Sequence, residues 1–292
     1  MNVRKLSLSR RSVTLAAAAW VGVVSLAIGA HAALNMRSLD ASRATETTQS
    51  IDVAGNRSSR IALVIGNGHY PDASAPLTQS INDARGLTAA LRRNGFDVDV
   101  IEDASKDDMT RAVARLKAKV KPDSVVMLFF GGYGIQVGRD SYMIPVDAAI
   151  WKESDVRRNA VSVESVLEVM KENGACAKLV VLDASRRNPY ERRFRGFSHG
   201  LAPIAAPDNA LILSSATPGR VADDGKGANS VLVTELLTNI NAQVDKASGA
   251  EAVFNQTRVA ISRASEGEQV PSVSSSLLED VSFGAREEKA GG

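Results

Sequence analysis

An apolar run at residues 179–182 limits most strongly what this chain can fold into. Branched aliphatic residues follow one another there without polar alternation, which indicates a strand buried on both faces in the middle of a parallel sheet. The run ends in Asp183, Ala184 and Ser185. Ligands and catalytic groups collect just beyond the carboxyl ends of such strands. We therefore expect Asp183 and Ser185 to lie at the functional edge of the sheet.

The rest of the folded region alternates between strand and helix patterns. Strands are predicted at residues 60–65, 96–101, 124–130, 142–146 and 210–215, and helices at 81–94, 106–120, 161–172, 231–243 and 250–264. Residues 271–283 are expected to return to the sheet. Alternation of this kind gives parallel βαβ units, so the predicted fold is a three-layer α/β/α sandwich with a mostly parallel central sheet.

Composition favours one large domain over two small ones. The chain has 292 residues, 44% of them hydrophobic, and a formal net charge of +2. We place the domain at residues 60–284. The near-neutral charge gives no reason to expect a nucleic-acid partner. A single cysteine, Cys176, excludes an internal disulfide and a cysteine-based metal cluster.

The amino terminus has the pattern of an export signal. Basic residues precede an apolar stretch at 15–30, and Ala30-His31-Ala32 offers a small-x-small cleavage site, so residues 1–32 are predicted to be a signal peptide. The alternative is an uncleaved membrane anchor, since the stretch is about long enough to span a bilayer. Either way we expect an exported protein, in the periplasm or anchored in the inner membrane facing it. Residues 33–59 are predicted to be a flexible linker and 285–292 a disordered tail.

Several short motifs occur in order along residues 60–283. They are Gly66-Asn67-Gly68-His69-Tyr70, Asn82-Asp83-Ala84, Gly132-Tyr133-Gly134, Ile144-Pro145-Val146-Asp147, Leu182-Asp183-Ala184-Ser185-Arg186-Arg187-Asn188-Pro189 and Asn229-Ser230. In these motifs the chain resembles the bacterial caspase-like cysteine peptidases (peptidase C14), the group that includes metacaspases. The resemblance implies a caspase-like α/β/α sandwich.

The two positions that carry the family's chemistry are substituted. The resemblance implies a histidine base in the Gly-His-Gly turn and a cysteine nucleophile after Leu-Asp-Ala, and here those positions hold Tyr133 and Ser185. A serine hydroxyl must lose its proton to a base as it attacks, while a phenol with a reference pKa near 10 is a proton donor at neutral pH. We therefore predict a pseudopeptidase. The alternatives are a weak Arg/Lys-directed hydrolase that uses Ser185 and a small-ligand module unrelated to proteolysis.

The resemblance also implies a pocket for an Arg or Lys side chain. Its residues here would be Ser80, Asp83, Gly131 and Asp183. Paired carboxylates could bind a guanidinium in bidentate fashion, which predicts a peptide or protein ligand with a basic side chain. The alternative roles are structural: Asp183 as an acceptor in the turn and Asp83 as an acid in the first turn of a helix.

An arginine-rich segment follows the central strand. Arg186, Arg187, Arg192 and Arg193 are expected to form a solvated loop, with an acidic or anionic partner as the functional alternative. We expect no metal, because the acids form no recognisable calcium cluster. We also expect no cofactor, since Gly66-Asn67-Gly68 lacks both the full dinucleotide fingerprint and the Walker lysine.

Overall fold

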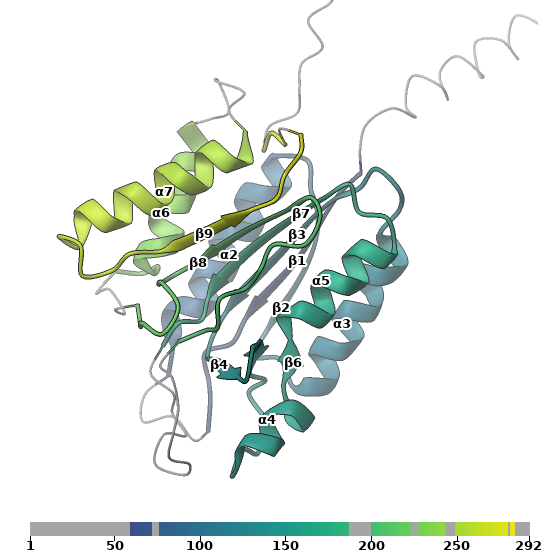
Figure 1. Cartoon of the computed structure of the whole chain (residues 1–292), viewed down its shortest axis with the longest axis vertical. Coiled ribbons are helices and arrows are strands. Elements are labelled where there is room, and N and C mark those ends of the chain that lie inside the picture. Colours follow the sequence, from purple (N-terminus) through teal and green to yellow (C-terminus); the bar gives the residue numbers. More distant parts are fainter. Residues whose placement is uncertain are drawn as a thin grey trace, which may run out of the picture. The chain divides into compact units, whose positions relative to one another are not determined.

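A computed structural model describes residues 59–71, 76–186, 200–222, 227–242, 249–279 and 281–283. The predicted leader, most of the predicted linker and the predicted tail lie outside these ranges. The described residues form an α/β fold around a six-stranded sheet (Figure 1).

The central sheet has the strand order β2-β1-β3-β7-β8-β9. Its strands are β1 (Arg60–Gly66), β2 (Asp97–Glu102), β3 (Val125–Gly131), β7 (Ala177–Asp183), β8 (Ala210–Ser214) and β9 (Ser272–Ser275). All neighbouring pairs are parallel except β8 and β9. The predicted mostly parallel sheet is confirmed, and β9 is the predicted return of the chain to it.

Helices cover the two faces of this sheet in separate layers (Figure 1). On one face lie α2 (Thr78–Arg93), α6 (Val231–Ala242) and α7 (Ala250–Ala264), and on the other lie α3 (Lys106–Lys119) and α5 (Val163–Glu172). Alternate residues of β7 supply both layers, with Leu179 and Val181 in the first cluster and Val180 and Leu182 in the second. This alternation explains why β7 is apolar throughout.

Polar side chains set where two of these helices begin. The Ser105 hydroxyl accepts a hydrogen bond from the backbone N–H of Asp108, and the Ser105 N–H donates to the Asp108 carboxylate. Together these two bonds form a capping box at the start of α3. The Ser162 hydroxyl accepts a hydrogen bond from the N–H of Ser165 and caps the start of α5. None of the helices within the described ranges has both the length and the apolar character needed to cross a membrane.

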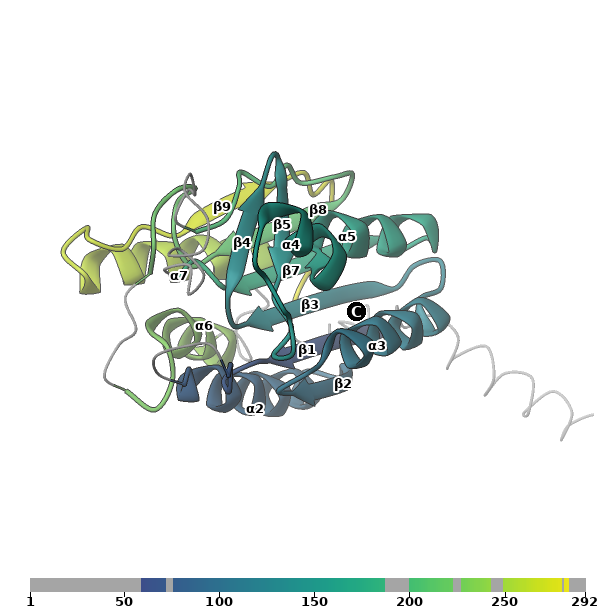
Figure 2. The same cartoon turned by 90° about the horizontal axis from the view of Figure 1, so that it is seen from below.

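A small second sheet stands at the carboxyl end of the central one. It consists of β4 (Gly134–Val137), β5 (Asp140–Met143) and β6 (Val161–Ser162), next to the short helix α4 (Glu153–Asn159) (Figure 2). Sequence patterns predicted only one strand here, at 142–146, because these elements are too short to carry a clear period. β4 follows β3 after a single turn, so the small sheet flanks the functional edge.

Candidate functional site

The tips of β3 and β7 run side by side at the carboxyl edge of the sheet. Gly131 is the register partner of Asp183. Beyond that pair, the Gly132 N–H donates to the Asp183 carbonyl at 3.2 Å and the Gly134 N–H donates to the Ala184 carbonyl at 3.0 Å. These contacts bring the turn that holds Tyr133 against the turn that holds Ser185.

Ser185 is buried, and its backbone contacts residues that follow β8. The residue is 1% exposed. Its N–H donates to the Ser215 hydroxyl at 3.3 Å, and its carbonyl accepts from the Ala222 N–H at 2.6 Å. Among the described residues, none forms a hydrogen bond with the Ser185 hydroxyl. The nucleophile position therefore has no general base in contact with it in this part of the chain.

Tyr133 is half-buried and packs against an apolar cluster that includes Tyr70 and Ile144. Its N–H donates to the Tyr70 oxygen at 3.1 Å, and the Tyr70 hydroxyl donates to the Ile144 carbonyl at 2.9 Å. The two rings meet edge to face with centroids 4.8 Å apart. A Cβ on Gly132 would lie 2.5 Å from the Tyr70 oxygen, so only glycine fits before Tyr133.

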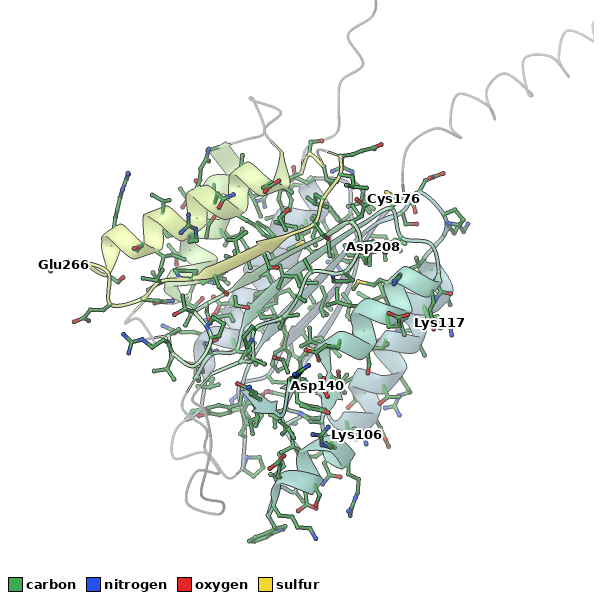
Figure 3. All side chains as sticks on the ribbon, in the orientation of Figure 1. Lys106, Lys117, Asp140, Cys176, Asp208 and Glu266 are labelled. Carbon is green, nitrogen blue, oxygen red and sulfur yellow. The ribbon has the colours of Figure 1, made fainter. Side chains whose placement is uncertain are left out.

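Two other groups could in principle replace the missing chemistry. His69, the one histidine within the described ranges, is exposed, and its Nδ1 lies 2.6 Å from Asp103 Oδ2. The single thiol, Cys176, precedes β7, while Ser185 follows it, so about 20 Å of strand separates them. In Figure 3, Cys176 lies at one end of the central sheet, and Asp140 of the small sheet lies beyond the other end. Partial burial also raises the pKa of the Cys176 thiol, which lowers its thiolate content.

Ser80 and Asp83 come from the first turns of α2 and are completely buried. A Cβ on Gly131 would touch the Ser80 Cβ at 3.4 Å, which fixes this part of α2 against the end of β3. Asp83 Oδ1 accepts from Asn229 Nδ2 at 2.8 Å and from the Ser230 N–H at 3.0 Å. Within the described ranges, Asp83 Oδ2 and the Ser80 hydroxyl have no hydrogen-bond partner.

This environment changes the acidity of Asp83. Burial, followed by the nearby charge of Asp183, raises the pKa of the Asp83 carboxyl to about 7. The hydrogen bonds from Asn229 and Ser230 act in the opposite direction and are weaker in total. Asp83 is therefore a buried acid that changes charge near neutral pH.

Asp183 has a cationic partner from its own chain. Arg186 is 4% exposed, and its Nη2 lies 3.5 Å from Asp183 Oδ2. Its Nη1 donates to the Gly132 carbonyl at 3.0 Å and also to the Asp183 carbonyl. The expectation that Arg186 lies in a solvated loop is wrong, because its guanidinium is buried between the tips of β3 and β7. Arg187, Arg192 and Arg193 lie outside the described residues.

The structure therefore gathers all four predicted pocket residues, Ser80, Asp83, Gly131 and Asp183, at one edge, and all four are buried. Sequence reasoning missed Arg186 as the partner of Asp183 and Tyr70 as the contact of Tyr133. Asn229-Ser230 was visible as a motif, but its contact with Asp83 was not. Across the described ranges, no three His, Cys, Asp or Glu side chains gather as a metal site.

Comparison with known proteins agrees with this architecture. A family model described as the caspase domain matches residues 59–282. Mucosa-associated lymphoid tissue lymphoma translocation protein 1 of Homo sapiens is 31% identical over 136 residues, and its Mus musculus homolog gives the same identity over the same length. Each match covers 45% of this chain and 16% of the relative. The family match extends over most of the chain and over all of the described residues except residue 283, so this chain belongs to the caspase domain family.

Proposed function

We propose that this protein is a catalytically inactive caspase domain that binds a peptide or partner protein at the carboxyl edge of its sheet. The observation that carries this proposal is the state of Ser185, a residue that is 1% exposed and whose hydroxyl forms no hydrogen bond to a base in the described part of the chain. Tyr133 stands in the adjacent turn, where the family resemblance implies a histidine.

The chemistry supports inactivity in two steps. An alcohol needs a base to take its proton during attack on a carbonyl, and loss of such a base lowers the rate by about 10² to 10⁴. A tyrosine phenol holds its own proton at neutral pH and so cannot take another. Burial of Ser185 adds a steric barrier, because a substrate carbonyl must come within bonding distance of the hydroxyl.

The pocket residues support binding. Asp83 keeps one carboxylate oxygen without a partner among the described residues, next to the similarly unpaired Ser80 hydroxyl. A guanidinium or ammonium group would satisfy both and would offset the charge of Asp83. We therefore propose that the ligand presents an Arg or Lys side chain.

Entry of such a side chain requires the edge to open. Segment 227–230 covers this part of α2: Gln79 Nε2 donates to the Gly227 carbonyl at 2.8 Å and Asn82 Nδ2 donates to the Ala228 carbonyl at 2.9 Å. Asn229 and Ser230 bind Asp83 itself. Breaking these contacts uses part of the binding energy, so we expect affinity in the micromolar to millimolar range.

The test combines catalysis and binding on the full chain. Fluorogenic peptides ending in Arg or Lys should be cleaved no faster by the wild type than by Ser185→Ala. A capped Ala-Ala-Arg peptide should bind in calorimetry, and its citrulline counterpart, which has the same shape without the charge, should not. Brisk cleavage that is lost in Ser185→Ala would instead establish the hydrolase alternative.

We also propose that the domain is exported, on the basis of the basic and apolar residues at 1–32. Fractionation of a bacterial host should place the protein in the periplasm or the inner membrane. Recovery only in the cytoplasm would contradict this part of the proposal.

A further inference from the structure

We propose that a cationic side chain entering the pocket displaces a proton from Asp83, so that ligand binding is coupled to pH. This inference rests on the proposed function, because it concerns how the same pocket takes its ligand. It adds a regulatory property: the domain would bind its partner more tightly in a neutral or alkaline environment than in an acidic one.

The hydrogen bonds of Asp83 give the first reason. The side chain is completely buried, and the Asn229 Nδ2 and Ser230 N–H donors both bind the same oxygen, Oδ1. The Ser230 hydroxyl also acts on this carboxyl as a hydrogen-bond donor and lowers its pKa, but by less than burial raises it. The other oxygen, Oδ2, has no partner within the described ranges. When this carboxylate is ionised, Oδ2 has lost its hydration and gains no hydrogen bond in exchange, which favours the protonated form.

The neighbouring charges give the second reason. Asp183 approaches Asp83 closely enough to oppose its ionisation. The buried cation at this edge, Arg186, pairs with Asp183 and not with Asp83. Among the described residues, Asp183 therefore has a buried cationic partner at this edge, whereas Asp83 has none.

Other charged groups on elements that contact α2 are already paired or lie elsewhere. On β2, Glu102 receives two hydrogen bonds from Arg85, at 2.7 and 2.6 Å. β3 carries no charged residue, and the charged residue of β1, Arg60, lies at the opposite end of the strand. On β2, Asp97 pairs with Lys119 of α3, and Asp99 pairs with Arg115 of α3. The other charged residues of α2 and α6 are Arg92, Arg93 and Glu235.

The raised pKa of Asp83 and the constant charge of an arginine side chain together couple binding to pH. With a pKa of about 7, Asp83 is protonated in roughly half of the molecules at neutral pH. An arginine side chain stays charged at every pH of interest, so it pairs best with the ionised carboxylate. Each binding event at neutral pH would therefore release a fraction of a proton from Asp83.

The experiment is calorimetry of the full chain with the capped Ala-Ala-Arg peptide at several pH values. If only the ionised form binds, a pKa of about 7 predicts affinity about tenfold weaker at pH 6 than at pH 8. At pH 7, the heat measured in phosphate and in Tris should differ by the amount that corresponds to release of about half a proton. The ligand itself contributes nothing to this dependence, because its guanidinium does not titrate.

Two variants make the result specific. Asp83→Asn keeps the shape of the side chain and cannot titrate, so any residual binding should be independent of pH. Asp107→Asn removes one acid from the exposed first turn of α3 and should keep the tenfold dependence. Equal affinity of the wild type at pH 6 and pH 8 would overturn the proton coupling and leave the proposed function standing.

A measurement without ligand tests the same point independently. Carbon-13 NMR of selectively labelled aspartate carboxyls, assigned by comparison with Asp83→Asn, should show one carboxyl that titrates near pH 7. An Asp83 carboxyl that titrates below pH 5 overturns the inference whether or not the peptide binds. Absence of peptide binding at every pH, for a carboxyl that does titrate near 7, would overturn the proposed function together with the coupling that depends on it.

Discussion

The carboxyl edge of the sheet has two halves that differ in how well their residue types match those that the family resemblance implies. The reactive half, Tyr133 and Ser185, has lost both residue types that the family resemblance implies. The pocket half, Ser80, Asp83 and Asp183, holds the residue types that the resemblance implies for a cation pocket. The difference teaches that the fold of this edge does not depend on the residue types of the reactive pair, because the backbone contacts between β3 and β7 form without them.

The largest effect should come from restoring the reactive half. We expect Tyr133→His together with Ser185→Cys to cleave Arg substrates at least about 10²-fold faster than the wild type, because an imidazole can activate a thiol. The measurement is release of a fluorogenic group. Each single variant serves as a control and should stay near background. A double variant that folds but stays inactive would show that burial at position 185, and not only the residue types, blocks catalysis.

The next effect concerns the cation shared by the two halves. Arg186→Leu should destabilise the domain by about 3–5 kcal/mol, because it leaves the Asp183 carboxylate buried without a charge partner. Chemical denaturation measures this change. The matched control is Arg111→Leu, which removes an exposed arginine paired with Asp108 and should cost less than about 1 kcal/mol. Equal effects of the two variants would mean that Asp183 gains little from its buried partner.

Asp83, in the pocket half, should also make the free energy of unfolding depend on pH. The pKa of Asp83 is raised from 3.8 to about 7 in the folded domain, so the folded state binds more protons than the unfolded state between these values. The contribution of Asp83 to stability is therefore present below pH 4 and is lost as the pH rises through 7. The loss is on the order of 4 kcal/mol.

Comparison with Asp83→Asn isolates this contribution. The variant should gain stability relative to the wild type as the pH rises from 4 to 8, because asparagine carries no charge to bury. Thermal denaturation across this range gives the difference between the two curves, and Asp107→Asn is the control for loss of an exposed acid. A difference that stays constant with pH would refute the raised acidity of Asp83.

The smallest effect concerns the aromatic support of the reactive half. Tyr70→Phe removes the hydroxyl that accepts from the Tyr133 N–H and donates to the Ile144 carbonyl. The Tyr133 N–H loses this acceptor, while the Ile144 carbonyl keeps the hydrogen bond from Asn67 Nδ2 at 3.2 Å. We therefore expect a loss of about 1–3 kcal/mol with the fold retained. Tyr142→Phe offers a milder comparison, since its hydroxyl makes only long contacts, at 3.5 Å to Asp140 and 3.4 Å from Arg157. Equal losses would indicate that the Tyr70 hydroxyl is replaced by water.

The sequence by itself determined the fold class and the residue types at the reactive edge. The apolar run of β7 has no polar alternation, so burial on both faces and a mostly parallel sheet could be predicted from it. Tyr133 and Ser185 could be placed by the motifs around them. The bounds of α3 and α5 could be predicted to within two residues from the local apolar period, because the residues that carry this signal lie close together in the sequence.

Only the tertiary structure decided the burial of Arg186 and the acidity of Asp83 at the carboxyl edge of the sheet. Arg186 sits in a charged run whose composition suggests solvent exposure, and its burial depends on the carbonyl of Gly132, 54 positions away. The acidity of Asp83 depends on Asn229 and Ser230, 146 and 147 positions away, and on the carboxylate of Asp183. Local sequence patterns carry no information about contacts at such separations, because they form only when the strands and helices have packed.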